Sequence, residues 1–401
     1  MKIIRCRQGE SCRLFRVCRF TAGGLLFALA LICWPVRAQQ AALSGPLVAF
    51  TDAAQQQIFL YDVGSGAQRA LAFGAGWLNV WGFSPDGCRV LFTQGDGLAQ
   101  LYSARLDGSD RRDLVRYDGA PAGTWGVWSP RWSPDGARIA FVLIEGAPDA
   151  NGVRDHRIAW VGAQGGAPEF YSITGDEHEP EWSPDGRWLA YISYTERVPG
   201  ADIYSTAAPT PEGQTTPLLR EADVWVVSAD GQTKYALTSF PVGSARAPRW
   251  SPDGELVSFI YSPSPGNDLF WMIAGQPGAI PTQLNFQWSL ILDMTWLPDG
   301  SAILGAVRDW HEDVPDNRLW TIPLVGNGDT GSALYLAGLD LSYADYPRFS
   351  PDGRWLALRS EYMPALVDVA AGTFALLDAS PGNTPPVWSP PGFAGEAACG
   401  Y

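Results

Sequence analysis

The sequence predicts an all-β fold, a seven-bladed β-propeller of four-stranded blades closed by pairing of the N-terminal and C-terminal strands. Three observations predict it: a turn motif that recurs along the chain, three strand-like runs between successive copies, and incomplete sets of strands at the two ends. A six-bladed ring is the alternative. The 401 residues are therefore expected to build one large ring rather than two or three ordinary domains.

The recurring motif is an aromatic residue followed by Ser-Pro-Asp-Gly or a close variant. Its copies are FSPDG at Phe83, WSPDG at Trp132, Trp182 and Trp250, WLPDG at Trp296, FSPDG at Phe349 and WSPPG at Trp388. The aromatic residues are spaced by 49, 50, 68, 46, 53 and 39 positions, and such periods are typical of one propeller blade.

The aspartate of this motif is expected to shape a turn rather than to act as a catalytic acid. Proline presets φ at the second position of a β-turn, and Asp and Gly suit the positions that follow. A ring needs the same corner in every blade, whereas an enzyme does not need six copies of one acid. The six aspartates are Asp86, Asp135, Asp185, Asp253, Asp299 and Asp352.

Three strand-like runs lie between successive motifs. After Gly186 they are RWLAYISY, ADVWVVSADG and TKYALTS, which are rich in β-branched and aromatic residues. If the strand ending in the motif is strand A, these runs are strands B, C and D.

The two ends of the chain complete one blade between them. LVAFTD, QIFLYDV and AQRALAF come before the first motif and supply B, C and D without an A strand, whereas TPPVW before Ser389 is an A strand with only a tail behind it. Pairing of these ends leaves no sheet edge open.

The first 38 residues predict a cleavable export signal. Six basic residues, Lys2, Arg5, Arg7, Arg13, Arg16 and Arg19, precede the apolar run AGGLLFALALICWPV, which ends at Val-Arg-Ala. The run is short for a membrane span, so a retained anchor is the lesser alternative, as is lipid attachment at Cys33. We expect an exported chain, periplasmic or extracellular, without stable membrane insertion after cleavage. The expected organisation is 1–38 signal peptide, 39–46 linker, 47–394 β-propeller and 395–401 C-terminal tail.

Charge and cysteine content restrict the partners. The full chain has net charge −14, and loss of residues 1–38 leaves 21 basic and 41 acidic side chains, net −20. Such a surface repels nucleic acid and anionic lipid. Cys88 and Cys399 remain after cleavage, and closure of the ring would bring both near the seam. A disulfide between them and two separate free thiols both stay open.

The (W/F)SPDG corner followed by an apolar strand resembles the WD-like repeats of the TolB propeller family, over roughly residues 47 to 394. The resemblance implies a propeller used as a binding platform or as a substrate-gating domain of a prolyl-oligopeptidase-type peptidase. Two departures limit what it implies. No small α/β domain fits between Ala38 and Leu47, and no peptidase domain is expected downstream, so neither the partners of TolB nor a peptidase activity is carried over.

The loops opposite the Pro-Asp corners hold the unusual side chains. His156, His178 and His311 each fall in a B–C or D–A loop, as does the Pro- and Thr-rich stretch 195–222, which is expected to be a mobile loop and a candidate lid. No nucleophile elbow, phosphate loop, His-Glu-x-x-His or Cys-x-x-Cys motif is present. The sequence therefore favours a chain that is not an enzyme, without excluding chemistry assembled from several loops.

The candidate ligand site is the channel mouth, because the D–A loops lead into the innermost strands. The candidate residues are Trp125, Trp128, Glu177, His178, Glu179, Arg246, Asp293, Asp345, Tyr346 and Asn383, with Asn79 at the corresponding place in the first blade. Trp77, Trp81, Trp125 and Trp128 are candidates for stacking on a ligand or for burial between blades, with exposure favoured for Trp125 or Trp128 alone. No cofactor is expected.

Metal binding at the mouth is left undecided. Glu177, His178 and Glu179 are a conceivable divalent-metal set with Asp345, but consecutive strand residues point apart. His311, beside Glu312 and Asp313, is expected to be a solvated loop residue.

Three functional hypotheses follow. The first is an exported, non-catalytic binding module that recognises a peptide, protein or glycan through its loop face. The alternative is an extracellular lyase or hydrolase acting on a polymer, with His178 as base and Arg246 or an acid nearby. The third is an assembly role in which an acidic ring docks a basic partner.

Overall fold

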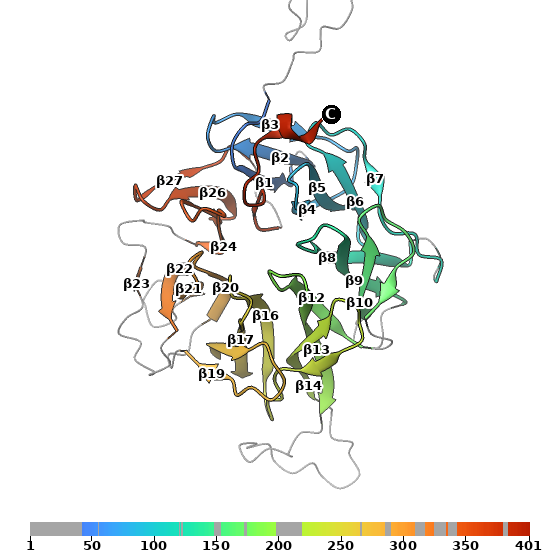
Figure 1. The fold of residues 1–401 in the computed structure, drawn as a ribbon, viewed down its shortest axis with the longest axis vertical. Helices are drawn as coiled ribbons and strands as arrows, with labels where there is room; N and C mark the ends of the chain where they lie inside the picture. Colours follow the sequence, from blue (N-terminus) through green and yellow to red (C-terminus); the bar gives the residue numbers. More distant parts are fainter. Residues whose placement is uncertain are drawn as a thin grey trace, which may run out of the picture. The chain divides into compact units, whose positions relative to one another are not determined.

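The computed structural model describes residues 42–54, 56–119, 121, 123–147, 154–171, 175–197, 219–264, 267–284, 290–308, 317–324, 334–335, 343–379 and 384–401. They lie in the unit Ala41–Tyr401 and form 28 strands in seven antiparallel, four-stranded sheets. Each sheet is one blade, and the blades follow one another around a ring (Figure 1). The all-β, seven-bladed prediction is confirmed, and the six-bladed alternative is wrong.

The first four blades follow the chain from the inner strand outward. Blade 1 is β4 (Leu78–Phe83), β5 (Arg89–Gln94), β6 (Gln100–Arg105) and β7 (Arg112–Asp113). Blade 2 is β8 (Trp125–Trp132), β9 (Arg138–Glu145), β10 (Asp155–Gly162) and β11 (Glu169–Phe170). Blade 3 is β12 (Glu177–Trp182), β13 (Trp188–Arg197), β14 (Leu219–Ser228) and β15 (Lys234–Ala236). Blade 4 is β16 (Ser244–Trp250), β17 (Leu256–Ser264), β18 (Asn267–Ala274) and β19 (Thr282–Gln283).

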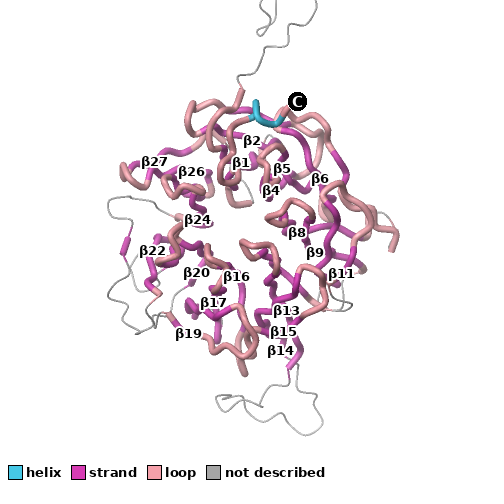
Figure 2. Tube along the Cα trace, viewed as in Figure 1, coloured by secondary structure: helices cyan, strands magenta, loops and turns pink. Residues whose placement is uncertain are grey.

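The last three blades include the one shared by both ends. Blade 5 is β20 (Leu290–Trp296), β21 (Ala302–Arg308), β22 (Asn317–Pro323) and β23 (Leu334–Tyr335). Blade 6 is β24 (Asp345–Phe349), β25 (Trp355–Ser360), β26 (Met363–Asp368) and β27 (Thr373–Leu376). Blade 7 is β28 (Val387–Trp388), β1 (Leu47–Asp52), β2 (Gln57–Asp62) and β3 (Gln68–Leu71). Among the described residues the one helix is a 3₁₀ turn, Glu396–Cys399, coloured cyan in Figure 2.

The two ends of the chain close the ring as predicted. β28 pairs antiparallel with β1, with Val48 opposite Trp388 and Ala49 opposite Val387. The inner strands then contact one another in sequence: β4 with β8, β8 with β12, β12 with β16, β16 with β20, β20 with β24, β24 with β28, and β28 with β4. Only two residues of β28 pair with β1. Other contacts of the C-terminal segment therefore also help to hold the ring closed.

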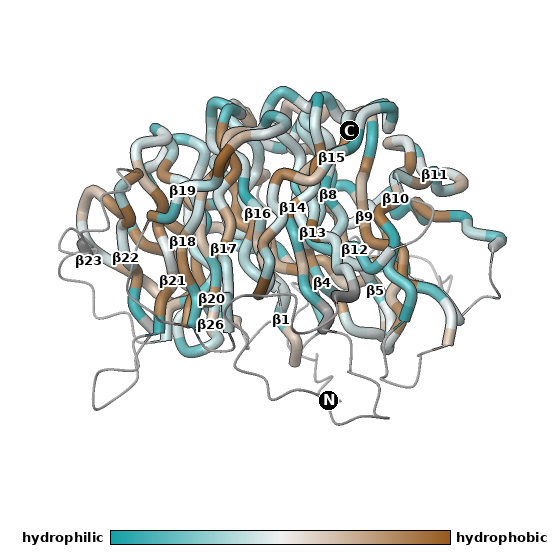
Figure 3. The backbone as a smooth tube through the Cα atoms, turned by 90° about the horizontal axis from the view of Figure 1, so that it is seen from below, coloured by the Kyte–Doolittle hydropathy of each residue, from teal (hydrophilic) through white to brown (hydrophobic). Residues whose placement is uncertain are grey.

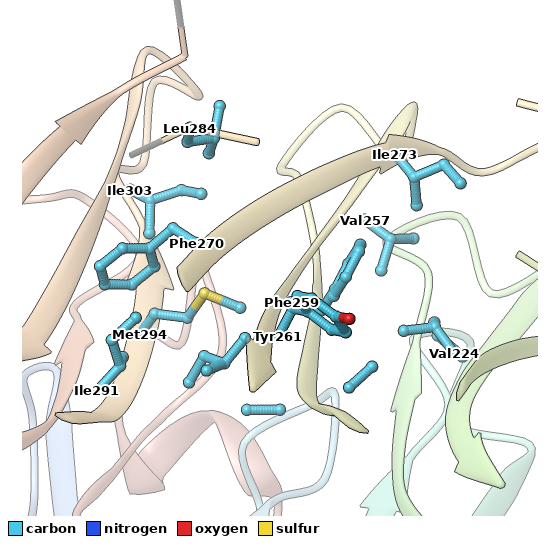
Figure 4. Close-up of a cluster of buried hydrophobic side chains, with 14 of the residues drawn as sticks. Val224, Val257, Phe259, Tyr261, Phe270, Ile273, Leu284, Ile291, Met294 and Ile303 are labelled. Atoms are coloured by element: carbon cyan, nitrogen blue, oxygen red, sulfur yellow. The ribbon is translucent and has the colours of Figure 1, made fainter. Parts of the chain in front are cut away.

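Buried hydrophobic side chains pack within and between the blades. Figure 4 shows one such cluster, in which Val224 of blade 3, Phe259 of blade 4 and Met294 of blade 5 are buried together. Figure 3 shows the hydrophobic residues distributed along the strands. A strand sandwiched between two blades is apolar on both faces, which explains runs such as the fully buried β1.

The Pro-Asp corners are turns held by their own side chains. In the third copy, the Ser183 hydroxyl donates to Asp185 Oδ1 at 2.6 Å, and the same oxygen accepts the Arg187 N–H at 3.0 Å. The Trp188 N–H donates to Ser183 Oγ at 3.0 Å, which ties the turn to β13. Gly186 takes φ +69°, a left-handed conformation that favours glycine. Asp185 is therefore a structural corner, as the repetition predicts.

The C-terminal segment is fastened across the seam between blades 7 and 1. Cys88 and Cys399 form a disulfide with a Cα–Cα distance of 5.5 Å, although 311 residues separate them in the sequence. The Arg69 guanidinium pairs with Glu396 at 2.6 Å, and the Leu106 N–H donates to Tyr401 Oη at 2.9 Å. Of the two states that the sequence left open for these cysteines, the structure adopts the paired one.

Two sequence expectations concern segments that the structure describes only in part. Residues 195–197 and 219–222 of the expected loop belong to β13 and β14, and residues 198–218 lie outside the described residues. Residues 1–41, which hold the predicted export signal, also lie outside them. Within the described part of the chain, no helix has the length and apolar character to cross a membrane.

Candidate functional site

The inner strands of four blades share a bulge just before the Pro-Asp corner. Ser129, Glu179, Ala247 and Tyr346 each have φ between +51° and +55°, and each precedes a proline. The strand pairing shifts register at these places in β8, β12, β16 and β24. Because a left-handed residue before proline is unfavourable, the bulge is a strained feature, and bulges commonly re-aim side chains near functional sites.

The residue after each of these prolines lines the central channel. Three of the four are arginines, Arg131, Arg249 and Arg348, and the fourth is Glu181. Each arginine takes the same pose, because its Nη1 donates to the carbonyl of the preceding proline at 3.0, 2.9 and 2.7 Å respectively. The shared bulge therefore presents three guanidinium groups to one channel.

One buried carboxylate joins two of these arginines. Asp293 accepts Arg249 Nη2 on Oδ1 at 3.0 Å and Arg348 Nη2 on Oδ2 at 2.6 Å. Burial raises the pKa of Asp293, but the charges of Arg348 and Arg249 outweigh burial and hold that pKa below its usual range. Asp293 is therefore ionised and neutralises one of the two guanidiniums.

The third guanidinium is less fully compensated. Arg131 Nε lies 3.5 Å from Glu181 Oε2, which is a longer contact than either bond to Asp293. Burial lowers the pKa of Arg131; Glu181 opposes this shift, and the charges of Arg249 and Arg348 add to it. Its side chain is 27% exposed, so solvent or a ligand in the channel can reach it. Guanidinium groups bind carboxylates in a bidentate geometry, so this convergence favours an anionic ligand.

Two tryptophans border the same channel. Trp81 and Trp128 make an edge-to-face contact with ring centroids 4.9 Å apart. The Trp81 indole N–H donates to Thr93 Oγ1 at 2.9 Å, which holds its ring in place, and Arg131 lies over that ring at 5.6 Å. Trp128 is 45% exposed. The rim thus offers an aromatic surface beside the guanidiniums.

Two adjoining cavities lie in the channel. The outer cavity is nearer the D–A loops and the other is nearer the Pro-Asp corners. Each has a volume of about 250 Å³, and both are lined by Trp81, Arg131, Arg249, Arg348 and Pro385. The outer cavity is lined by Trp81, Trp128, Ser129, Arg131, Glu179, Pro180, Arg246, Ala247, Arg249, Leu292, Asp293, Tyr346, Arg348, Thr384 and Pro385. Its charged side chains are four arginines and two acids, Glu179 and Asp293, so its sign is opposite to that of the whole chain.

Five of the predicted site residues line this outer cavity, namely Trp128, Glu179, Arg246, Asp293 and Tyr346. Glu179 accepts the Ala247 N–H, which links blades 3 and 4. Arg246 pairs with Asp268 at 2.6 Å and donates to the Ile291 carbonyl at 2.7 Å. These bonds hold Glu179 and Arg246 in the wall of the cavity.

The other predicted residues lie elsewhere. Trp125 is 7% exposed and packs edge-on against Tyr117. Glu177 is buried, where it accepts the Ile158 N–H at 3.0 Å and pairs with Lys234 at 3.2 Å. Asp345 forms a bidentate pair with Arg359, with both distances 2.8 Å. Burial raises the pKa of Asp345 despite Arg359. Asn383 lies outside the described residues.

The structure does not bring together Glu177, His178, Glu179 and Asp345, the residues for which metal binding was left undecided. Glu177, Glu179 and Asp345 each bind a different protein group, as described above, because the bulge after His178 sends neighbouring side chains of β12 in different directions. His178 instead meets Asp176 and His156 between blades 2 and 3. Burial lowers the pKa of His178, against the opposing charges of Glu179 and Glu177. His311 lies outside the described residues.

The most important residues that sequence reasoning missed are Arg131, Arg249 and Arg348. They stand one position before the motif aromatic, whereas candidates such as Glu179, Asp293 and Tyr346 stand three positions before it. The signal is visible in the sequence as SPRW, APRW and YPRF, three copies of Pro-Arg before an aromatic residue. Glu181 occupies the same place in EPEW.

Comparison with known proteins gives partial sequence similarity. No protein-family model matches the chain. It is 32% identical over 148 residues to the uncharacterized protein Atu1656 of Agrobacterium fabrum, covering 34% of this chain and 47% of that protein. It is 24% identical over 230 residues to the uncharacterized peptidase YuxL of Bacillus subtilis, covering 57% and 29%. It is 39% identical over 66 residues to the Tol-Pal system protein TolB of Alcanivorax borkumensis, covering 16% and 14%. The matches thus span less than half of each of these relatives.

Solved structures share the fold. An oligogalacturonate lyase from Vibrio parahaemolyticus has a TM-score of 0.56 at 14% identity, covering 81% of this chain and 91% of that one. An oligogalacturonate lyase in complex with manganese gives 0.54 at 17%, covering 77% and 81%. Puromycin hydrolase gives 0.56 at 16%, covering 87% and 54%. At these identities the likeness shows the fold alone. The chain is thus a seven-bladed β-propeller that is similar in sequence to TolB over 66 residues.

Proposed function

We propose that this chain is an exported, non-catalytic binding module that takes a carboxylate-bearing segment of a peptide, protein or glycan into its central channel. The observation that carries the proposal is the convergence of Arg131, Arg249 and Arg348 beside the Trp81–Trp128 pair. Arginine forks recognise carboxylates, and the tryptophan rings give an apolar or sugar-stacking surface next to them.

The electrostatics of the channel favour an acidic ligand over a basic one. Asp293 is already shared by two guanidiniums, and Glu179 is bound to the backbone of blade 4. The outer surface of a chain with net charge −14 repels acidic molecules, so an acidic ligand is bound by local geometry rather than by long-range attraction. The charge of the channel therefore disfavours the hypothesis in which an acidic ring docks a basic partner.

Export is part of the proposal. The basic, apolar and small-residue order of residues 1–38 supports it, and so does the Cys88–Cys399 disulfide, because such bonds persist mainly in oxidising compartments. N-terminal sequencing of the protein recovered outside the cytoplasm should begin near Gln39. Recovery of an intact Met1 from the cytoplasm alone would reject export.

The enzyme alternative has less support in the geometry. It needs His178 as a base with Arg246 nearby, but His178 contacts Asp176, and Arg246 is paired with Asp268. The outer cavity is lined by Arg246 and Glu179, and His178 is not among its lining residues. The likeness of fold to lyases and hydrolases therefore assigns no catalytic role to the residues of this channel.

Removal of Arg131 should weaken binding of an acidic ligand. We expect Arg131→Ala to reduce affinity about 10- to 100-fold, since a hydrogen bond to a charged group contributes about 1.5–3 kcal/mol. Arg131 is the best choice because its ion pair with Glu181 is long, so its loss disturbs the fold least. The measurement is fluorescence titration with hexaglutamate and with an oligogalacturonate hexamer, followed through tryptophan emission.

Matched controls separate recognition from general charge. Arg354→Ala removes an arginine whose side chain is 62% exposed and pairs with Asp368, in the turn beyond the Pro-Asp corner, so affinity should not change. Hexaglutamine and a neutral glucose hexamer are the uncharged probes. Equal binding of the charged and neutral probes, or an Arg131→Ala variant that binds like the unchanged protein, would rule out the proposal. Preference for hexaglutamate or for the oligogalacturonate distinguishes a peptide from a glycan ligand.

A further inference from the structure

A compact group of metal-ligating side chains lies between blades 2 and 3, separate from the cavity residues. His156 is on β10, His178 is on β12, and Asp176 comes just before β12. His178 Nε2 is 2.7 Å and His156 Nδ1 is 3.3 Å from Asp176 Oδ1. One ligand atom from each of the three residues lies within 4.8 Å of the others, and no second group of this kind exists among the described residues.

The backbone explains why these three side chains meet. Asp176 and His178 are two positions apart, so they share one face of the inner strand, whereas Glu177 points to the other face and is bound there. His156 comes from the neighbouring blade through a parallel bridge to Asp176. The Tyr194 N–H donates to the Asp176 carbonyl at 2.9 Å and thereby fixes the start of β12.

The spacing of the ligand atoms suits one small cation. With metal–ligand distances of about 2.0–2.2 Å, the ligand atoms of a tetrahedral ion are about 3.4 Å apart. The His156–Asp176 distance of 3.3 Å already matches that edge, and the His178–Asp176 distance of 2.7 Å needs to widen by about 0.7 Å, which a change of side-chain rotamer can supply. The two imidazole rings lie at 39° with centroids 4.5 Å apart, so both ring edges face the same carboxylate.

The surroundings of the three side chains are suited to holding them in place. All three are half-buried, which limits their freedom without closing the group off from solvent. The Tyr194 ring makes an edge-to-face contact with His178 at 5.4 Å and restricts the imidazole. The three residues supply three protein ligands, one fewer than a tetrahedral ion takes.

We propose that His156, Asp176 and His178 hold a divalent transition-metal ion, with Zn²⁺ the first choice, which clips blade 2 to blade 3. Two imidazole nitrogens and one carboxylate oxygen are a donor set for Zn²⁺ and its neighbours in the first transition row, whereas Ca²⁺ and Mg²⁺ require mostly oxygen ligands. The site is independent of the proposed ligand channel, because none of its three residues lines the cavity.

The test is zinc binding by the purified full chain, without an affinity tag and after treatment with a chelator. Equilibrium dialysis with elemental analysis should find about one Zn²⁺ per chain, and zinc should raise the melting temperature, because an ion that binds the folded state stabilises it. Mg²⁺ should do neither. Failure of zinc to bind, or zinc that binds without raising the melting temperature, would overturn the proposal.

Variants assign the ligands. His178→Ala and Asp176→Asn should each weaken zinc binding at least about 100-fold, since loss of even an outer-shell partner costs 10- to 100-fold. His311→Ala is the matched control, because it removes the one histidine that the proposal does not use, and it should bind zinc normally. Full binding by His178→Ala, or loss of binding in His311→Ala, would reject this assignment. Circular dichroism and metal-free melting show whether each variant is folded, and His156→Ala gives a third, independent removal.

Discussion

Replacing Asp293 by alanine is expected to lower the free energy of unfolding by about 3–5 kcal/mol, because it leaves buried guanidinium charge without its partner. Asp293 is 3% exposed and bonds to Arg249 at 3.0 Å and to Arg348 at 2.6 Å. It also accepts the Met294 N–H at 2.8 Å, so the substitution removes a backbone acceptor as well. Urea unfolding at neutral pH, followed by tryptophan fluorescence, measures the loss.

The stabilisation by Asp293 should depend on pH, in the direction set by the shift in its pKa. The folded chain holds the pKa of Asp293 below its unfolded value, so its stabilisation is complete above about pH 4 and is lost as pH falls through the folded pKa. The stability difference between the unchanged protein and Asp293→Ala should therefore shrink in acid. Arg354→Ala is the control, since its exposed ion pair at 3.5 Å should contribute less than about 1 kcal/mol. A difference that stays constant into acid would contradict the role given to Asp293.

Asp293→Asn also links stability to the proposed function. This variant keeps the size of the side chain but removes the charge that neutralises Arg249 and Arg348. It should be less stable than the unchanged protein and yet bind hexaglutamate more tightly, because two guanidiniums become available to the ligand carboxylates. A loss of stability together with a loss of acidic-ligand affinity would mean that the arginine group serves the fold alone.

The architecture was predictable because its signals repeat. Seven copies of one corner mark the ends of seven inner strands, and five of them are stabilised locally by a bond from their own Ser to their own Asp. Closure was predictable by counting strands, since LVAFTD had no partner except the strand before Ser389. Neither inference needed any long-range side-chain contact to be known.

The site was predicted only in part because the bulges break strand alternation. Alternation of side chains along a strand places Trp125 and Trp128 on opposite faces of β8. In the structure Trp125 is buried and Trp128 is exposed, so this rule separates the two correctly. Alternation also places Glu177 and Glu179 on one face, but Glu179 has φ +55° and points into the channel while Glu177 is buried between blades. The bulge depends on a left-handed residue before proline, which sequence patterns do not predict.

The sequence also could not predict which charged residues pair with one another. Asp293, Arg249 and Arg348 come from three different blades, and the set of His156, Asp176 and His178 joins two. Their meeting depends on how neighbouring blades are positioned to within about 1 Å, which no local pattern contains. For the disulfide, the predicted closure brought both cysteines to one seam, but the sequence left open whether they pair.

Removing the disulfide with Cys88→Ser and Cys399→Ser together is expected to destabilise the protein by about 3–5 kcal/mol, because a cross-link over a long loop restricts the unfolded chain. The bond joins residues 311 positions apart and so encloses most of the propeller. Denaturant unfolding of the oxidised protein and of the double variant gives the difference, and reduction of the unchanged protein should reproduce it. The double variant should not respond to reductant.

The position of the bond predicts where the weakened protein opens first. β28 contributes only two paired residues to blade 7, and Glu396 and Tyr401 hold the tail beside it through Arg69 and Leu106. Without the disulfide, hydrogen exchange should rise in β28 and β1 before it rises in blades 3 and 4, since closure of the ring depends on that short pairing. Uniform loss of protection around the ring would instead mean that the cross-link acts only on the unfolded chain and that β28 closes blade 7 without it.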